Sequence, residues 1–131
     1  MTEKGNAQEA IISTADKAAD LRKALTEKKR QGNSIALDKL SGVLRFAENL
    51  SQEQAIIKYS GTIDLTVSLV DEVEHCGDIL EGVLTRASIR HTVDESDSFT
   101  RVILYNIGGA EAEEMIEFAL EAVEAGLAET D

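Results

Sequence analysis

The 131-residue sequence has no proline, no tryptophan and a single cysteine, and its aromatic residues are three Phe and two Tyr. Because proline is the commonest breaker of regular structure, its absence favours long, uninterrupted helices and strands. With so few aromatic side chains, the core has to be built from Leu, Ile, Val and Ala. The single cysteine, Cys76, excludes an internal disulfide and fits a reducing compartment.

Long apolar runs are also missing. No stretch approaches the roughly 20 apolar residues that span a bilayer, and the polar start MTEKGNAQEA lacks the apolar segment of a signal peptide. A hydrophobic fraction of 43% nonetheless suffices for a core. We therefore predict one cytoplasmic domain over residues 1–131, with a helical hairpin in 1–50 and an α+β body in 51–131.

Basic residues are scarce after residue 45. Residues 1–45 hold nine Lys/Arg and six Asp/Glu, a net charge of +3, whereas residues 46–131 hold four and nineteen, a net charge of −15. Such an acidic body repels nucleic-acid phosphates and acidic membranes and attracts basic surfaces. We expect no direct nucleic-acid binding and no membrane association. The simpler alternative is that the acidity only keeps the protein in solution.

Two helices are predicted before residue 51. Residues 7–30 carry apolar side chains at spacings of three and four, and Gly32 suits a left-handed cap at the end of this helix. Asn33-Ser34 then offers an N-cap for a second helix that continues to Leu50, followed by a separate short helical turn over 51–57. Because the link is short, the two helices should form an antiparallel hairpin.

The remaining pattern predicts the order β-α-β-β-α. Polar and apolar residues alternate over 62–69, which indicates a strand, and the helical period returns from Val70 to Arg86. Strands at 89–93 and 99–105 flank a polar hairpin loop at 94–98, and the second of them is apolar on both faces around 102–104. A last helix over 110–128 should bury seven residues: Ala112, Met115, Ile116, Ala119, Leu120, Val123 and Leu127.

These elements together predict an α+β fold: an N-terminal antiparallel helical hairpin followed by a β-α-β-β-α unit with a small, mostly antiparallel sheet. The strand at 99–105 should lie at the centre of the sheet, and helices should cover one face. Because a three-stranded sheet leaves edges to be hidden, we expect a homo-oligomer, most simply a dimer.

Three local patterns resemble sites of chemistry. Gly108-Gly109 before a helix suits a phosphate, but Glu111, Glu113 and Glu114 occupy the positive helix end instead. Glu72 and His75 have the spacing of half a di-iron site, and His75, Cys76 and His91 supply three of four zinc ligands. The chain has no second Glu-x-x-His and no fourth zinc ligand, and no nucleophile has a recognised catalytic motif. We therefore predict no catalytic residues, no metal, no cofactor and no enzymatic activity.

The distribution of charge suggests a surface for a partner. Glu113, Glu117, Glu121 and Glu124 follow one another along the last helix, which has no Lys or Arg to offset their repulsion. Lys28, Lys29 and Arg30 form a basic tip at the end of the first helix. Either the tip docks on an acidic helix, in the same chain or in another subunit, or the acidic face binds a basic partner protein.

The function predicted from this pattern is a non-enzymatic, acidic protein-interaction module of the adaptor, chaperone or inhibitor type, acting as a homo-oligomer. The alternative is a small-anion or nucleotide-binding protein, a sponge, that uses four residues near a subunit interface: Arg90, His91, Arg101 and Tyr105. Paired arginines bind carboxylates and phosphates well. An exposed strand face with ordinary cross-strand partners, such as Asp64, would explain the same residues without a ligand.

Overall fold

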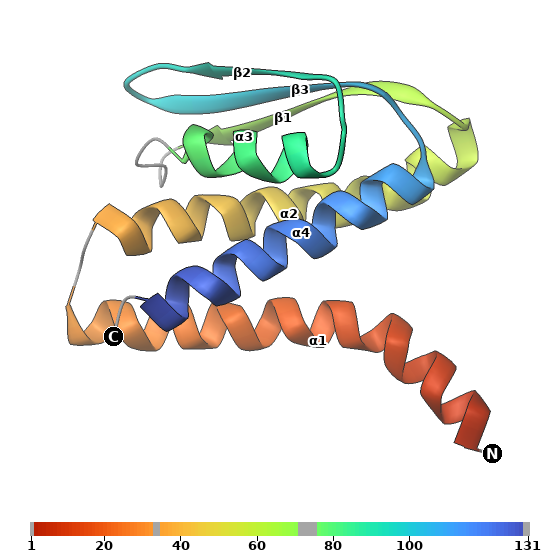
Figure 1. Cartoon of the computed structure of the whole chain (residues 1–131), viewed down its shortest axis with the longest axis horizontal. Helices are drawn as coiled ribbons and strands as arrows, with labels where there is room; N and C mark the ends of the chain where they lie inside the picture. The colour runs from red at the N-terminus through yellow and green to blue at the C-terminus, as the bar shows by residue number, and fades with distance from the viewer. Residues whose placement is uncertain (1, 33–34, 71–75, 130–131) are drawn as a thin grey trace.

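The computed structural model describes residues 2–32, 35–70 and 76–129, and the side chains of residues 16–32, 35–69 and 76–129. Within these ranges the order of elements is the predicted α-α-β-α-β-β-α, and the class is α+β (Figure 1). The elements are α1 (Thr2–Gln31), α2 (Ile35–Ser60), β1 (Ile63–Val70), α3 (Gly77–Arg86), β2 (His91–Glu95), β3 (Phe99–Ile107) and α4 (Gly109–Glu129).

The three strands form one antiparallel sheet in the order β1-β3-β2. The prediction of a central position for the strand that is apolar on both faces is confirmed, since β3 pairs on both sides. Its Val102 and Leu104 are fully buried toward the helices, whereas Ile103 and Tyr105 are half-buried and point the other way. The β2–β3 loop is shorter than predicted, because Asp94 and the residue after it pair with β3 and belong to β2.

All described helices lie on one side of the sheet (Figure 1). The antiparallel helices α2 and α4 run beneath it with α3 beside them, and α1 packs against the far side of α2 and α4. The helices α1 and α2 lie side by side in opposite directions, so the predicted helical hairpin is present (Figure 1). Coverage of one sheet face is also confirmed. No helix in the described part of the chain is both long and apolar enough to cross a membrane.

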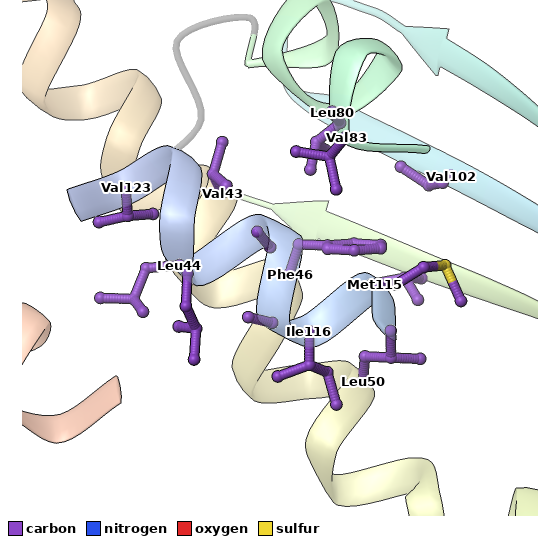
Figure 2. Packing of buried hydrophobic residues seen from close by; sticks show 14 of the residues in the cluster. Val43, Leu44, Phe46, Leu50, Leu80, Val83, Val102, Met115, Ile116 and Val123 are labelled. Carbon is purple, nitrogen blue, oxygen red and sulfur yellow. The ribbon is translucent and has the colours of Figure 1, made fainter. Parts of the chain in front are cut away.

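The core is centred between α2 and α4. Phe46 of α2 and Met115 of α4 are fully buried, and Leu80 of α3 and Val102 of β3 close the core from the sheet side (Figure 2). The buried residues of α4 are the seven predicted from its helical period. Near its end, α4 approaches α2 so closely that a Cβ on Gly126 would lie 2.5 Å from a methyl carbon of Leu40.

The predicted break in the second helix is wrong. The helix α2 continues without interruption from Ile35 to Ser60, because Leu50 and Ile57, seven residues apart, are both fully buried on the same stripe. A helical turn newly capped by Ser51 would have broken that stripe. The left-handed residue that ends α2 is Gly61, with φ 91°.

Other element boundaries also differ from the sequence predictions. The helix α1 begins at Thr2, earlier than residue 7, and Gly32 caps it through its N–H without a left-handed backbone. Val70 ends β1 and does not start a helix; α3 begins at Gly77, with Cys76 at its N-cap. The predicted helical residues 71–75 lie outside the described residues.

Candidate functional site

The acidic surface predicted on the last helix lies along α4. Glu113, Glu117, Glu121 and Glu124 are all exposed, because the opposite side of α4 is the buried stripe that packs on α2. Spacings of three and four place them in a row on one side of the helix. We name these four residues the acidic face.

The two ends of the acidic face differ in their ion pairs. Glu121 forms an ion pair with Arg86 of α3 at 3.1 Å, and Glu124 forms one with Lys17 of α1 at 3.3 Å. Arg86 is also held over the ring of Phe118, 4.0 Å from its centroid. Glu113 and Glu117, in contrast, make no ion pair or hydrogen bond with the described residues. The half of the acidic face nearer the start of α4 is therefore the half without a compensating cation among the described side chains.

The basic tip at the end of α1 pairs within the helical hairpin. Lys29 lies 3.2 Å from Asp38 of α2, and Arg30 lies 3.7 Å from Glu27 of its own helix. Lys28 is half-buried at the same end. Among the described side chains of α1, Lys17 pairs with the acidic face, and it lies three turns before the tip.

The residues of the predicted anion site are divided between the two faces of the sheet. Arg101 and Tyr105 lie on the outer face, where Arg90 extends over the Tyr105 ring at 5.5 Å from its centroid. Arg101 lies 4.0 Å from Asp94 and 4.7 Å from the centroid of the Phe99 ring. His91 points toward the helices.

His91 is held by two groups on the helical side. Its Nδ1 hydrogen-bonds the carbonyl oxygen of Ile89 at 2.6 Å, and its Nε2 contacts the carboxylate of Glu81 on α3. The structure therefore places Arg90 beside Tyr105 and Arg101 on the same face four positions away along β3, and it separates the histidine from all three. Asp64, proposed as a cross-strand partner, instead accepts a hydrogen bond from the backbone N–H of Asn106 at 2.8 Å.

At the glycine turn, the place of a phosphate is taken by a side chain of the same helix. The N–H of Gly108 donates to Oε1 of Glu111 at 2.9 Å, and the carbonyl oxygen of Gly108 accepts the first helical hydrogen bond from Ala112 at 3.0 Å. This is the geometry of a carboxylate that caps its own helix at the third position. The interpretation of Gly108-Gly109 as a structural turn fits this arrangement.

The cysteine is a packing residue at the start of α3. Cys76 is fully buried, and burial, reinforced by the nearby charge of Glu95, raises the pKa of its thiol to about 12. A thiol held protonated is a poor nucleophile and a poor metal ligand. No cluster of three His, Cys, Asp or Glu side chains suited to a metal occurs among the described residues, and Glu72 and His75 lie outside them.

Sequence patterns did not indicate the polar contact that joins α1 to α2. The guanidinium of Arg22 donates to both carboxylate oxygens of Glu48, at 2.7 and 3.4 Å, and to the hydroxyl of buried Ser41 at 3.3 Å. A depression of about 340 Å³ lies beside it, between Arg22, Lys29 and their neighbours. Because Arg22 and Glu48 belong to two separate helices, no local spacing in the sequence indicates their contact.

A second depression of about 340 Å³ lies where α1, α2 and α4 meet. Its walls are mainly small or aliphatic, with Glu48 and two polar residues of α2 beside them; the lining residues are Ala18, Ala19, Ala47, Glu48, Ser51, Gln52, Ile116 and Leu120. No chemistry-bearing cluster is present among these residues.

Comparisons of the chain with models of protein families, with curated proteins and with solved structures find no match.

Proposed function

We propose that this protein is a non-enzymatic interaction module, of the adaptor, chaperone or inhibitor type, that acts as a cytoplasmic homo-oligomer and binds a basic partner through the acidic face of α4. The observation that carries the proposal is the difference between the two halves of that face. Glu121 and Glu124 have cations from α3 and α1, whereas Glu113 and Glu117 have none among the described residues.

The electrostatics of α4 support a role for Glu117 in particular. A carboxylate in the first turn of a helix is stabilised by the helix dipole, which explains the capping residue Glu111. Glu117 lies more than two turns from the start of α4, where that stabilisation has faded. It also lies four residues from Glu113 and from Glu121, and each such pair of like charges costs about 0.2–0.5 kcal/mol. A cation from a partner would relieve this repulsion.

The test compares two double variants that remove the same charge from the same helix. Immobilised wild-type protein is used to capture proteins from a lysate at low salt, and the bound proteins are released by a salt gradient and identified. In Glu113→Gln/Glu117→Gln we expect capture to fall at least tenfold. In the control Glu121→Gln/Glu124→Gln we expect a much smaller loss, since those carboxylates are already paired.

The outcome would contradict the proposal if nothing were captured in a salt-dependent way, or if both double variants retained their partners equally. Circular dichroism and a thermal melt of each variant separate loss of binding from loss of folding.

The alternative function, binding of a small anion by Arg90, Arg101 and Tyr105, stays a prediction with its own test. Thermal shifts with inorganic phosphate and with nucleotides should appear in wild type and vanish in Arg101→Ala.

A further inference from the structure

The outer face of the sheet is a broad surface that no described helix covers (Figure 1). Its residues form three rows across the strands. The middle row is Thr66–Ile103–Thr92, as the strand register pairs them. One flanking row contains Ser68, Arg101 and Asp94, and the other contains Asp64, Tyr105 and Arg90.

Side-chain contacts order this face without covering it. The hydroxyl groups of Thr92 and Tyr105 are 3.1 Å apart, Arg90 extends over the Tyr105 ring, and Arg101 lies beside both Asp94 and the Phe99 ring. Ile103 remains half-buried at the centre. The result is a preorganised surface with an aliphatic centre and charges on either side of it.

The charges on the outer face balance. Arg90 and Arg101 are offset by Asp64 and Asp94, whereas the whole chain carries a net charge of −12. Two copies of so acidic a protein repel each other over most of their surfaces. The outer face is a place where they can approach without that repulsion.

We infer that the outer face binds the same face of a second copy, around a two-fold axis that runs along the Thr66–Ile103–Thr92 row. Rotation about this axis places each strand over the same strand of the second copy and reverses its direction. Ile103 then meets Ile103 of the second copy. Arg90 meets the second copy's Asp94, and Arg101 meets the second copy's Tyr105.

This pairing is self-complementary because each flanking row of one copy lies against the other flanking row of the second copy. On either side of Thr92, at equal distances, lie the cation of Arg90 and the anion of Asp94, so the Arg90–Asp94 ion pair forms twice. On β3 a guanidinium and an aromatic ring lie at equal distances from Ile103, and such pairs attract. Stacked sheets pack about 10 Å apart, a distance that these side chains span.

The size of the face sets the strength of the contact. Three strands spaced by about 4.8 Å give a patch on the order of 15 by 25 Å, which is less than the roughly 800 Å² per partner of a standard stable interface. We therefore expect a reversible dimer with a dissociation constant on the order of 10 µM. The inference deepens the homo-oligomeric part of the proposed function and does not depend on the acidic face of α4.

Sedimentation velocity over about 1 to 200 µM protein tests the interface. Wild type should shift from monomer to dimer with concentration, and Ile103→Glu, which places two carboxylates on the axis, should weaken dimerisation at least tenfold. The matched control is Ile35→Glu on α2, where the wild-type residue is 67% exposed; it should dimerise as wild type does. A wild type that stays monomeric throughout, or an Ile103→Glu that still dimerises, overturns the inference.

Charge inversion tests the orientation and keeps the inference falsifiable if Ile103→Glu fails to fold. Arg90→Asp places a second carboxylate against Asp94 of the second copy, and Asp94→Arg places two guanidinium groups together. Each variant alone should therefore be more monomeric than wild type. Their equimolar mixture restores both ion pairs and should recover the heterodimer.

A mixture as monomeric as its components contradicts the proposed axis. Because none of these substitutions touches α4, their failure would leave the capture experiment with Glu113 and Glu117 intact, and the reverse also holds.

Discussion

The carboxylate of Glu95, the last residue of β2, accepts a hydrogen bond at 3.0 Å from the backbone N–H of Gly77, the first residue of α3. The hydroxyl of Thr100 donates to the same oxygen at 3.4 Å. The first N–H groups of a helix have no partner within it, so a carboxylate from another element both satisfies one of them and complements the helix dipole. A Cβ on Gly77 would lie 2.6 Å from Cδ of Glu95, so the contact needs glycine there.

Gly77→Ala should therefore destabilise the protein through Glu95 and not through the helix. We expect a loss of about 1 kcal/mol in wild type, the usual contribution of such a hydrogen bond. In a Glu95→Ala background the same substitution should be neutral or stabilising, because alanine favours helix over glycine. Urea unfolding of the four proteins measures the difference. An equal cost in both backgrounds would show that the Glu95 contact is not its cause.

Cys76 should resist thiol reagents while the protein is folded. It is fully buried, and a pKa of about 12 leaves roughly one thiol in 10⁴ ionised at pH 8. Labelling by a disulfide reagent should be slow in buffer and rapid in concentrated urea. Stoichiometric labelling of native protein within seconds would mean that the thiol is accessible.

The same pKa predicts a loss of stability in alkali. The folded state raises the pKa of Cys76 from its ordinary 9.0 to about 12, so folding favours the protonated thiol. Its contribution to stability is complete below about pH 9 and is lost as the pH rises toward 12. The difference in unfolding free energy between wild type and Cys76→Ala should therefore shrink steadily above about pH 9. A constant difference up to about pH 10.5 would contradict the assigned environment.

Helical and strand periodicity predicted the elements well, for a physical reason. Each side of α4 faces either the core or solvent throughout its length, so the spacing of its apolar residues identified the whole buried face. The central position of β3 followed in the same way from Ile103, an apolar residue between the buried Val102 and Leu104.

Local cap signals were less reliable, because tertiary packing overrides them. Ser51 has the spacing of a capping box, but the burial of Leu50 and Ile57 on one stripe stabilises an unbroken α2. The contact between Gly77 and Glu95 joins residues 18 positions apart. Such contacts depend on how elements pack, which no local spacing reveals.

For the candidate sites too, features set by local spacing could be predicted from sequence, and features set by tertiary packing could not. The row of carboxylates on α4 could be predicted from sequence, because it depends only on helical spacing. The ion pairs of these carboxylates could not be predicted from sequence, because their partners Lys17 and Arg86 come from two other helices. The arrangement of the outer face likewise depends on register, which places Asp94 and not Arg90 opposite Arg101.

Two helical glycines should respond to alanine with opposite signs. A Cβ on Gly126 would lie 2.5 and 2.9 Å from the two methyl carbons of Leu40, which is itself buried and has little room to move. Gly126→Ala should cost about 1–3 kcal/mol by overpacking. At Gly82 no atom lies within 4 Å of the added Cβ, so Gly82→Ala should stabilise by about 0.5–1 kcal/mol. Thermal melts of both variants test the pair, and a stabilised Gly126→Ala would refute the close packing of α2 on α4.

The cap of α4 gives a prediction with a control on the same helix. Glu111 accepts the N–H of Gly108 at 2.9 Å, so Glu111→Ala should cost about 1 kcal/mol of unfolding free energy. Glu114 is also exposed near the start of α4 and makes no hydrogen bond or ion pair with the described residues. Glu114→Ala should therefore change the unfolding free energy by less than about 0.5 kcal/mol. Equal effects of the two substitutions would attribute the stabilisation to the charge alone. A larger loss in Glu111→Ala that Glu111→Gln partly restores would assign it to the hydrogen bond, because the glutamine keeps an oxygen acceptor.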